Sequence, residues 1–136
     1  MDEAAKGKPP ATASEAVALA TRLLRFQVEL SGCRAEEVRA DAFVAGYLQG
    51  FCAGILTGLH TNSPGLFALH SMVCRAVFGD REGAGIVEHI ARVREEADFR
   101  EGERIGLADA LRSITEARAV GGLVVHLEGT RGRKPE

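Results

Sequence analysis

Apolar residues dominate one stretch of this chain, residues 42–59, where only Tyr47, Gln49 and Thr57 carry polar side chains. Within it, glycine recurs at every fourth position, namely at Gly46, Gly50, Gly54 and Gly58. Residues four apart share one face of a helix, so these glycines would form a ridge with almost no side chain. Each glycine costs roughly 0.5–1 kcal/mol relative to alanine, and close approach of another helix backbone usually offsets that cost. We therefore expect a central glycine-rich helix over residues 35–60.

Four more helices are expected around it from the spacing of apolar positions. The first begins near Ala13, because Thr12 and Glu15 match a capping box, and it ends at Ser31–Gly32. Its inward face should carry Leu19, Leu23, Phe26 and Leu30, widened by Val17, Leu24 and Val28. Serine, proline and glycine residues divide the following chain into expected helices over 64–78, 86–97 and 107–119.

The C-terminal part of the chain contains a short apolar run over residues 123–127, LVVHL, which follows a pair of glycines. A strand needs a pairing partner, and the sequence offers no second strand candidate. We expect an extended segment that lies on the helices or pairs with its twin in a dimer. The chain then forms one all-α domain over residues 12–127, with about five helices. A flexible arm over 1–11 and a disordered, charged tail over 128–136 complete the expected organisation.

The charge balance limits the classes of partner. Seventeen basic and nineteen acidic side chains give a net charge of −2, which argues against a nucleic-acid binder. The N-terminus has no apolar signal region, and three cysteines do not suggest a disulfide framework. We therefore expect a cytoplasmic protein, and the richness in alanine, glycine and arginine is typical of bacterial chains. The apolar stretch is slightly short for a membrane span and contains Gln49, so no membrane partner is expected.

The small number of expected helices bears on assembly. A helix that is apolar nearly all round must be covered on all sides. About five helices provide few covering elements, which favours a homodimer in which a second copy packs against the ridge of Gly46, Gly50, Gly54 and Gly58. A core position within a single chain is the alternative for this helix.

His70 and Cys74 are the best chemical pair, because they lie four residues apart on one helical face, where imidazole and thiolate can bind one Cu(I) or Zn(II) ion. The segment HSMVCRAVFGDREGAGIVEHI resembles part of the copper-responsive repressors of the CsoR type, which are all-helical and carry a His-x3-Cys pair. The resemblance covers about a fifth of the chain and implies a further cysteine on an earlier helix. Ala45 occupies that place, and Cys52 is a nearby substitute. A buried thiol beside a hydrogen-bonded histidine, without any cofactor, is the alternative.

Catalytic motifs are missing from the sequence. It contains no Gly-x-Ser-x-Gly elbow, no phosphate-binding glycine loop with Lys-Ser/Thr, and no His-Glu-x-x-His motif. We therefore expect a non-enzymatic helical module that binds itself and another protein, as an adaptor, a regulator, or an immunity- or chaperone-like partner. A metal- or thiol-responsive regulator that uses His70 and Cys74 is the alternative. A small-molecule pocket beside Tyr47 and Phe51 is a third interpretation.

Overall fold

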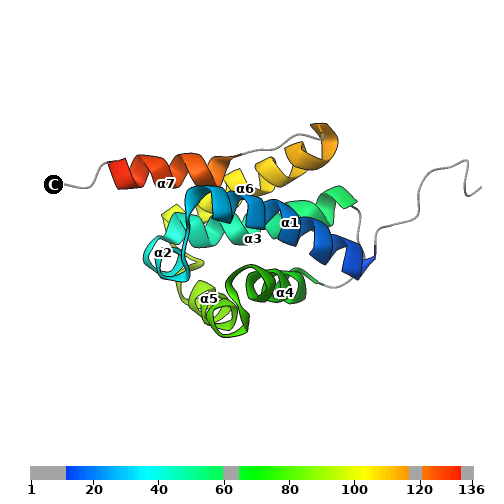
Figure 1. Cartoon of the computed structure of the whole chain (residues 1–136), viewed down its shortest axis with the longest axis horizontal. Coiled ribbons are helices and arrows are strands. Elements are labelled where there is room, and N and C mark those ends of the chain that lie inside the picture. The colour runs from blue at the N-terminus through cyan, green and yellow to red at the C-terminus, as the bar shows by residue number, and fades with distance from the viewer. Residues whose placement is uncertain (1–11, 60–64, 117–120, 133–136) are drawn as a thin grey trace, which may run out of the picture.

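The computed structural model describes residues 12–59, 65–116 and 121–132, and all regular structure in these residues is helical (Figure 1). The helices are α1 (Ala13–Ser31), α2 (Ala35–Ala40), α3 (Ala42–Leu59), α4 (Leu66–Phe78), α5 (Asp80–Val93), α6 (Ala97–Glu116) and α7 (Gly122–Gly132). The predicted all-α class is confirmed, whereas the expected number of about five helices was too low. α3 contacts each of the other described helices, and its most extensive interface is with α6.

The bounds of α1 agree with the prediction, because local hydrogen bonds set both of its ends. The Thr12 hydroxyl accepts a bond from the Glu15 N–H (3.1 Å), and the Glu15 carboxylate accepts one from the Thr12 N–H (2.8 Å). At the other end, Gly32 adopts a φ of 70° and donates its N–H to the Val28 carbonyl. This left-handed conformation is the usual way in which glycine ends a helix.

The buried face of α1 agrees with the prediction in part, because Leu24 and Val28 point into the core as expected. The apolar side chains that point into the core are Ala16, Ala20, Leu24 and Val28. By contrast, Phe26 is 50% exposed and Leu30 is 64% exposed, so their expected inward position was wrong, whereas Leu19 and Leu23 pack partly buried against the core. Apolar residues at helical spacing form two overlapping stripes on α1, one that contains Phe26 and Leu30 and one that contains Leu24 and Val28. The stripe with two alanines faces inward, where small side chains let α1 pack closely against its neighbours.

Three other helix boundaries also differ from the prediction. The expected helix over 35–60 is divided at Asp41, whose backbone is extended and whose carboxylate accepts a hydrogen bond from the Phe43 N–H (3.0 Å). Aspartate is a favoured N-cap residue, so it starts a new helix there. α5 and α6 begin at Asp80 and Ala97, earlier than the expected starts at 86 and 107. The glycines in these early turns do not interrupt the chain as expected, because Gly83, Gly85 and Gly102 lie inside the helices.

α7 corrects the prediction for the C-terminal segment. Residues 123–127 are helical rather than extended, and the helix continues to Gly132, beyond the expected start of a disordered tail at 128. β-branched Val124 and Val125 have low helix propensity, but Leu123 and Leu127 are buried in the core, and this burial favours the helix. The expected arm over 1–11, His60 and residues 133–136 lie outside the described residues.

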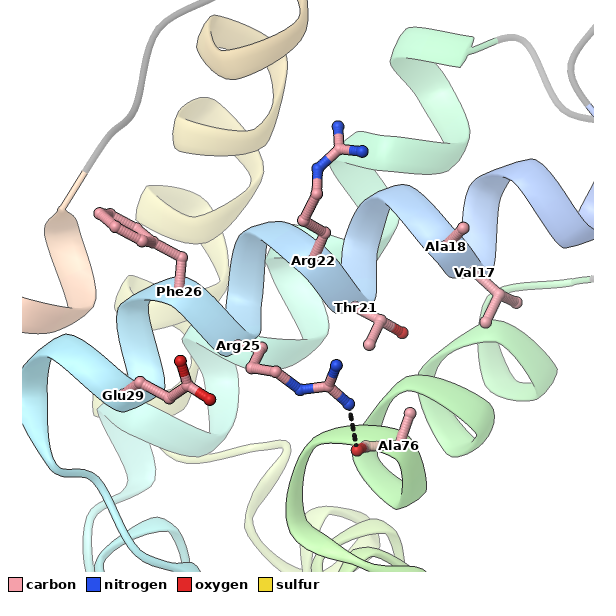
Figure 2. Close-up of a pocket in the computed structure, with 8 residues that line it drawn as sticks. All are labelled: Val17, Ala18, Thr21, Arg22, Arg25, Phe26, Glu29 and Ala76. Atoms are coloured by element: carbon pink, nitrogen blue, oxygen red, sulfur yellow. Dashed lines mark hydrogen bonds between the residues drawn. The ribbon is translucent and has the colours of Figure 1, made fainter.

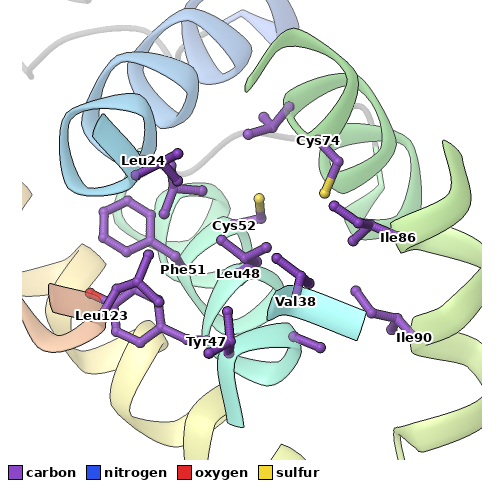
Figure 3. Close-up of a cluster of buried hydrophobic side chains, with 14 of the residues drawn as sticks. Leu24, Val38, Tyr47, Leu48, Phe51, Cys52, Cys74, Ile86, Ile90 and Leu123 are labelled. Atoms are coloured by element: carbon purple, nitrogen blue, oxygen red, sulfur yellow. The ribbon is translucent and has the colours of Figure 1, made fainter. Parts of the chain in front are cut away.

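Two of the three largest fully buried side chains, Tyr47 and Phe51, come from α3 (Figure 3), and the third is Phe99 of α6. Tyr47, Leu48 and Phe51 are at most 1% exposed. Leu24 of α1 and Leu123 of α7 lie on one side of this cluster, and Val38, Ile86 and Ile90 close the other side (Figure 3). α3 is also the one described helix long and apolar enough to cross a membrane, and 56% of it is buried inside the fold. A core helix of a bundle passes the same test.

Candidate functional site

The glycine ridge of α3 has a partner within the same chain. A Cβ atom added to Gly46 or Gly50 would overlap the carbonyl oxygens of Phe99 and Glu103, and one added to Gly54 would lie 2.6 Å from the Cβ of Ala110. The relation is mutual. On α6, a Cβ atom added to Gly102 or Gly106 would overlap the carbonyl oxygens of Phe43 and Tyr47.

This reciprocal contact bears on the expected dimer. Backbone meets backbone along α3 and α6, which is the close approach that offsets the low helix propensity of glycine. Gly58, the last residue of the ridge, faces the side chain of Ile114 on α6. The ridge of Gly46, Gly50, Gly54 and Gly58 is therefore occupied by α6, and a homodimer would need another surface.

The predicted chemical pair, His70 and Cys74, lies in the core on α4. Both residues are 2% exposed, and Cys52 of α3 is fully buried near Cys74 (Figure 3). Burial raises the pKa of the Cys74 thiol to about 12, and burial together with the Cys74 charge raises the pKa of Cys52. These thiols are therefore protonated at neutral pH. Among the described residues, no group of three His, Cys, Asp or Glu side chains is arranged to hold a metal ion.

The burial of His70 should make stability depend on pH. Burial lowers the pKa of His70 from 6.5 to about 4, and its Nε2 has no hydrogen-bond partner. Below pH 6.5 the unfolded chain gains a proton at this residue, whereas the folded chain gains one only near pH 4. The free energy of unfolding should therefore fall by up to about 3 kcal/mol as the pH drops through this window. Above pH 6.5, His70 should not contribute to the pH dependence of stability.

A His70→Leu variant tests this prediction, because leucine has a similar volume and cannot take up a proton. Urea unfolding at about pH 7.5 and about pH 4.5 should show a clearly smaller loss of stability in the variant than in the parent chain. Other groups titrate in both chains, so the difference between the two losses reports His70. Equal losses would contradict the assignment.

A buried polar network connects α1, α3, α6 and α7, and sequence reasoning missed it. The Tyr47 hydroxyl donates to the Asp109 carboxylate (2.6 Å) and accepts a bond from the Gln27 side-chain amide (2.8 Å). The same carboxylate accepts the Gly122 N–H (3.1 Å), and the Gln27 side-chain oxygen accepts the Leu123 N–H (3.1 Å). Gln27 is 1% exposed and Asp109 is 6% exposed. Burial and the bond to Asp109 raise the pKa of Tyr47, so its hydroxyl remains a donor.

This network fixes the start of α7. The first backbone N–H groups of a helix have no partners within it, and Asp109 and Gln27 supply acceptors for two of them. Further along α7, the His126 ring stacks on Phe43 with ring centroids 4.0 Å apart, and its Nε2 lies 2.8 Å from an Asp41 carboxylate oxygen. The space beside Tyr47, which the sequence left open to a small molecule, is occupied by Leu123 (Figure 3).

The outer face of α1 is the most distinctive exposed surface. Half-exposed Phe26 and largely exposed Leu30 lie on it, four residues apart. Beside them is an open groove of about 570 Å³ (Figure 2), and its lining residues are Val17, Ala18, Thr21, Arg22, Arg25, Phe26, Glu29 and Ala76. Within this lining, Arg25 of α1 donates a hydrogen bond to the Ala76 carbonyl of α4 (2.7 Å).

This surface combines exposed apolar side chains with charges of both signs. Exposed apolar side chains beside charges of both signs are typical of protein contact surfaces. The Thr21 hydroxyl, which lines the groove, is buried without a hydrogen-bond partner. No protein-family model, no curated protein and no solved structure matches this chain.

Proposed function

We propose that this chain is a non-enzymatic helical protein-binding module that acts as a homodimer, and that the outer face of α1 carries the contact between copies. The observation that supports this proposal is the exposure of Phe26 and Leu30 on a stripe that continues into half-buried Leu19 and Leu23. A partner that covers such a row removes apolar surface from water, and this burial lowers the free energy of the complex.

The charges on α1 favour a second copy as the partner. Arg22 and Glu29 are exposed and lie on the same side of the helix, seven residues apart. In an antiparallel pair with its two-fold axis between Arg25 and Phe26, Arg22 lies opposite Glu29 of the partner subunit. The symmetry repeats this pair, so one face complements itself. The two Phe26 rings would meet near the axis, with the opposite charges flanking them.

A charge exchange on α1 tests this arrangement. Arg22→Glu would place like charges opposite each other twice and should weaken the dimer about tenfold, and adding Glu29→Arg should restore it. Phe26→Ser with Leu30→Ser should give monomers. Phe67→Ser is the matched control, because Phe67 is 74% exposed on α4 and should not affect assembly. Sedimentation velocity at high micromolar concentration measures whether the parent chain and each variant are monomeric or dimeric. A parent chain that stays monomeric there would contradict the proposal.

A metal- or thiol-responsive regulator is the second candidate, and the buried, unpartnered Nε2 of His70 favours it. In that case His70 and Cys74, with Cys52, would take one equivalent of Cu(I) or Zn(II) per chain. Binding would require the Cys74 thiol to lose its proton, and its raised pKa opposes this. Titration of the parent chain and of a Cys74→Ala variant distinguishes the candidates, because only a metal sensor shows binding that the variant loses.

A further inference from the structure

α7 has little tendency to form a helix by itself. Isolated helices shorter than about 12–15 residues are marginal in water, and this one has 11 residues. Several of its residues have low helix propensity: Gly122, Val124, Val125, Gly129, Thr130 and Gly132. Its contacts with the groove formed by α1, α3 and α6 therefore maintain the helix. We call this the α7 groove, and define it by Gln27, Phe43, Tyr47 and Asp109.

The polar part of the α7 groove recognises the start of a helix rather than particular side chains. Asp109 and Gln27 accept hydrogen bonds from the backbone N–H groups of Gly122 and Leu123. Every helix presents such free N–H groups at its first turn, together with a partial positive charge that favours a carboxylate. The same acceptors would therefore serve another helix in the same position.

The apolar part of the groove selects side chains at three positions. Leu123 and Leu127, four residues apart, are 0% and 2% exposed, whereas Val125 on the opposite side is 71% exposed. A Cβ atom added to Gly122 would overlap the Asp109 carboxylate and lie 2.9 Å from the Tyr47 ring. The groove thus accepts a helix that begins Gly-Leu-x-x-x-Leu, in which the residue before the last leucine stacks on Phe43 as His126 does, and it leaves outward positions such as that of Val125 unspecified.

We propose that the α7 groove is the binding site for a partner-protein helix that begins Gly-Leu-x-x-x-Leu, and that α7 is a built-in occupant which the partner displaces. A partner helix with the same inward residues and better helix formers outside loses less conformational freedom on docking than α7 does. α7 in turn suppresses binding of weaker sequences, because any incoming helix must compete with an occupant that is always present on the same chain. This site is separate from the α1 face proposed for dimerisation.

A labelled peptide tests the groove in the full chain. The probe is a fluorescein-labelled peptide of residues 121–132 with Val125→Ala and Gly129→Ala, both at exposed positions. It should bind a full-length Leu123→Ser, Leu127→Ser variant at least tenfold more tightly than it binds the parent chain, because α7 no longer competes. A matched peptide with Gly122→Ala should bind that variant at least tenfold more weakly. Fluorescence anisotropy measures each affinity, and circular dichroism verifies that the chain variant is folded.

A folded variant that fails to bind the probe, or binds the Gly122→Ala peptide equally well, would overturn the proposal. A second measurement on the parent chain covers the case in which the variant does not fold. Excess probe should then accelerate hydrogen exchange of the α7 amides by at least tenfold while the α3 amides are unaffected. Unchanged exchange in α7 would equally overturn the proposal.

Discussion

Gly50→Ala is expected to destabilise the fold by about 3 kcal/mol or more, which is a large fraction of the 5–15 kcal/mol that typically holds a domain together. The new methyl group would overlap the carbonyl oxygen, carbonyl carbon and Cα of Glu103. These are backbone atoms of α6, so no side-chain rotation relieves the overlap, and the two helices must separate. Chemical unfolding monitored by circular dichroism measures the change.

Gly85→Ala is the matched control for that substitution. Gly85 also lies inside a helix, α5, but an added Cβ would lie 3.6 Å from the Arg39 guanidinium, an ordinary contact distance. Alanine has the higher helix propensity, so this variant should be more stable than the parent by about 0.5–1 kcal/mol. If Gly50→Ala is as stable as the parent chain or more stable, the close approach of α3 and α6 does not exist in solution.

Asp109→Ala should destabilise the chain by about 3 kcal/mol. The substitution removes the acceptor for the Tyr47 hydroxyl and for the Gly122 N–H, and it leaves a cavity at the junction of α3, α6 and α7. Buried donors that lose their only strong acceptor retain the full cost of desolvation. Because one of these donors starts α7, hydrogen exchange should also accelerate in that helix before the rest of the fold.

Two comparisons make the Asp109 result specific. Asp98→Ala, an exposed position in the first turn of α6, should change stability by less than about 1 kcal/mol. Combining Asp109→Ala with Tyr47→Phe should cost clearly less than the sum of the single changes, since both remove one shared hydrogen bond. Additive effects, or an Asp109→Ala variant as stable as Asp98→Ala, would contradict a stabilising network.

Local signals predicted the fold well where one short segment determines the structure. The capping box of Thr12 and Glu15 and the left-handed Gly32 fix the bounds of α1 within the segment itself. The predicted start of α6 was wrong because contacts with another helix, rather than local signals, determine it. Gly102 and Gly106 weaken a helix in isolation, and they are favourable only because the carbonyls of α3 occupy the space beside them. No pattern within residues 97–116 contains that information.

The sites were harder to predict than the helices. His70 and Cys74 stood out because they are adjacent on one helix, but their burial was not visible in the spacing. The polar network escaped notice because its members are far apart: Tyr47 and Asp109 by 62 residues, Gln27 and Leu123 by 96. The one available signal was Gln27 itself, a polar residue on the apolar side of α1. Its partners become evident only when four helices are assembled.

The reciprocal glycines of α3 and α6 also have a genetic consequence. Every single-nucleotide missense change in a glycine codon introduces a side chain with at least a Cβ atom. At Gly46, Gly50, Gly102 and Gly106, that atom would overlap a backbone carbonyl of the opposite helix. A compensating change cannot arise on the other helix, because the obstacle there is the main chain, which all residues share. These four codons should therefore tolerate only synonymous changes, even if the exposed surface of α1 diverges freely to suit new partners.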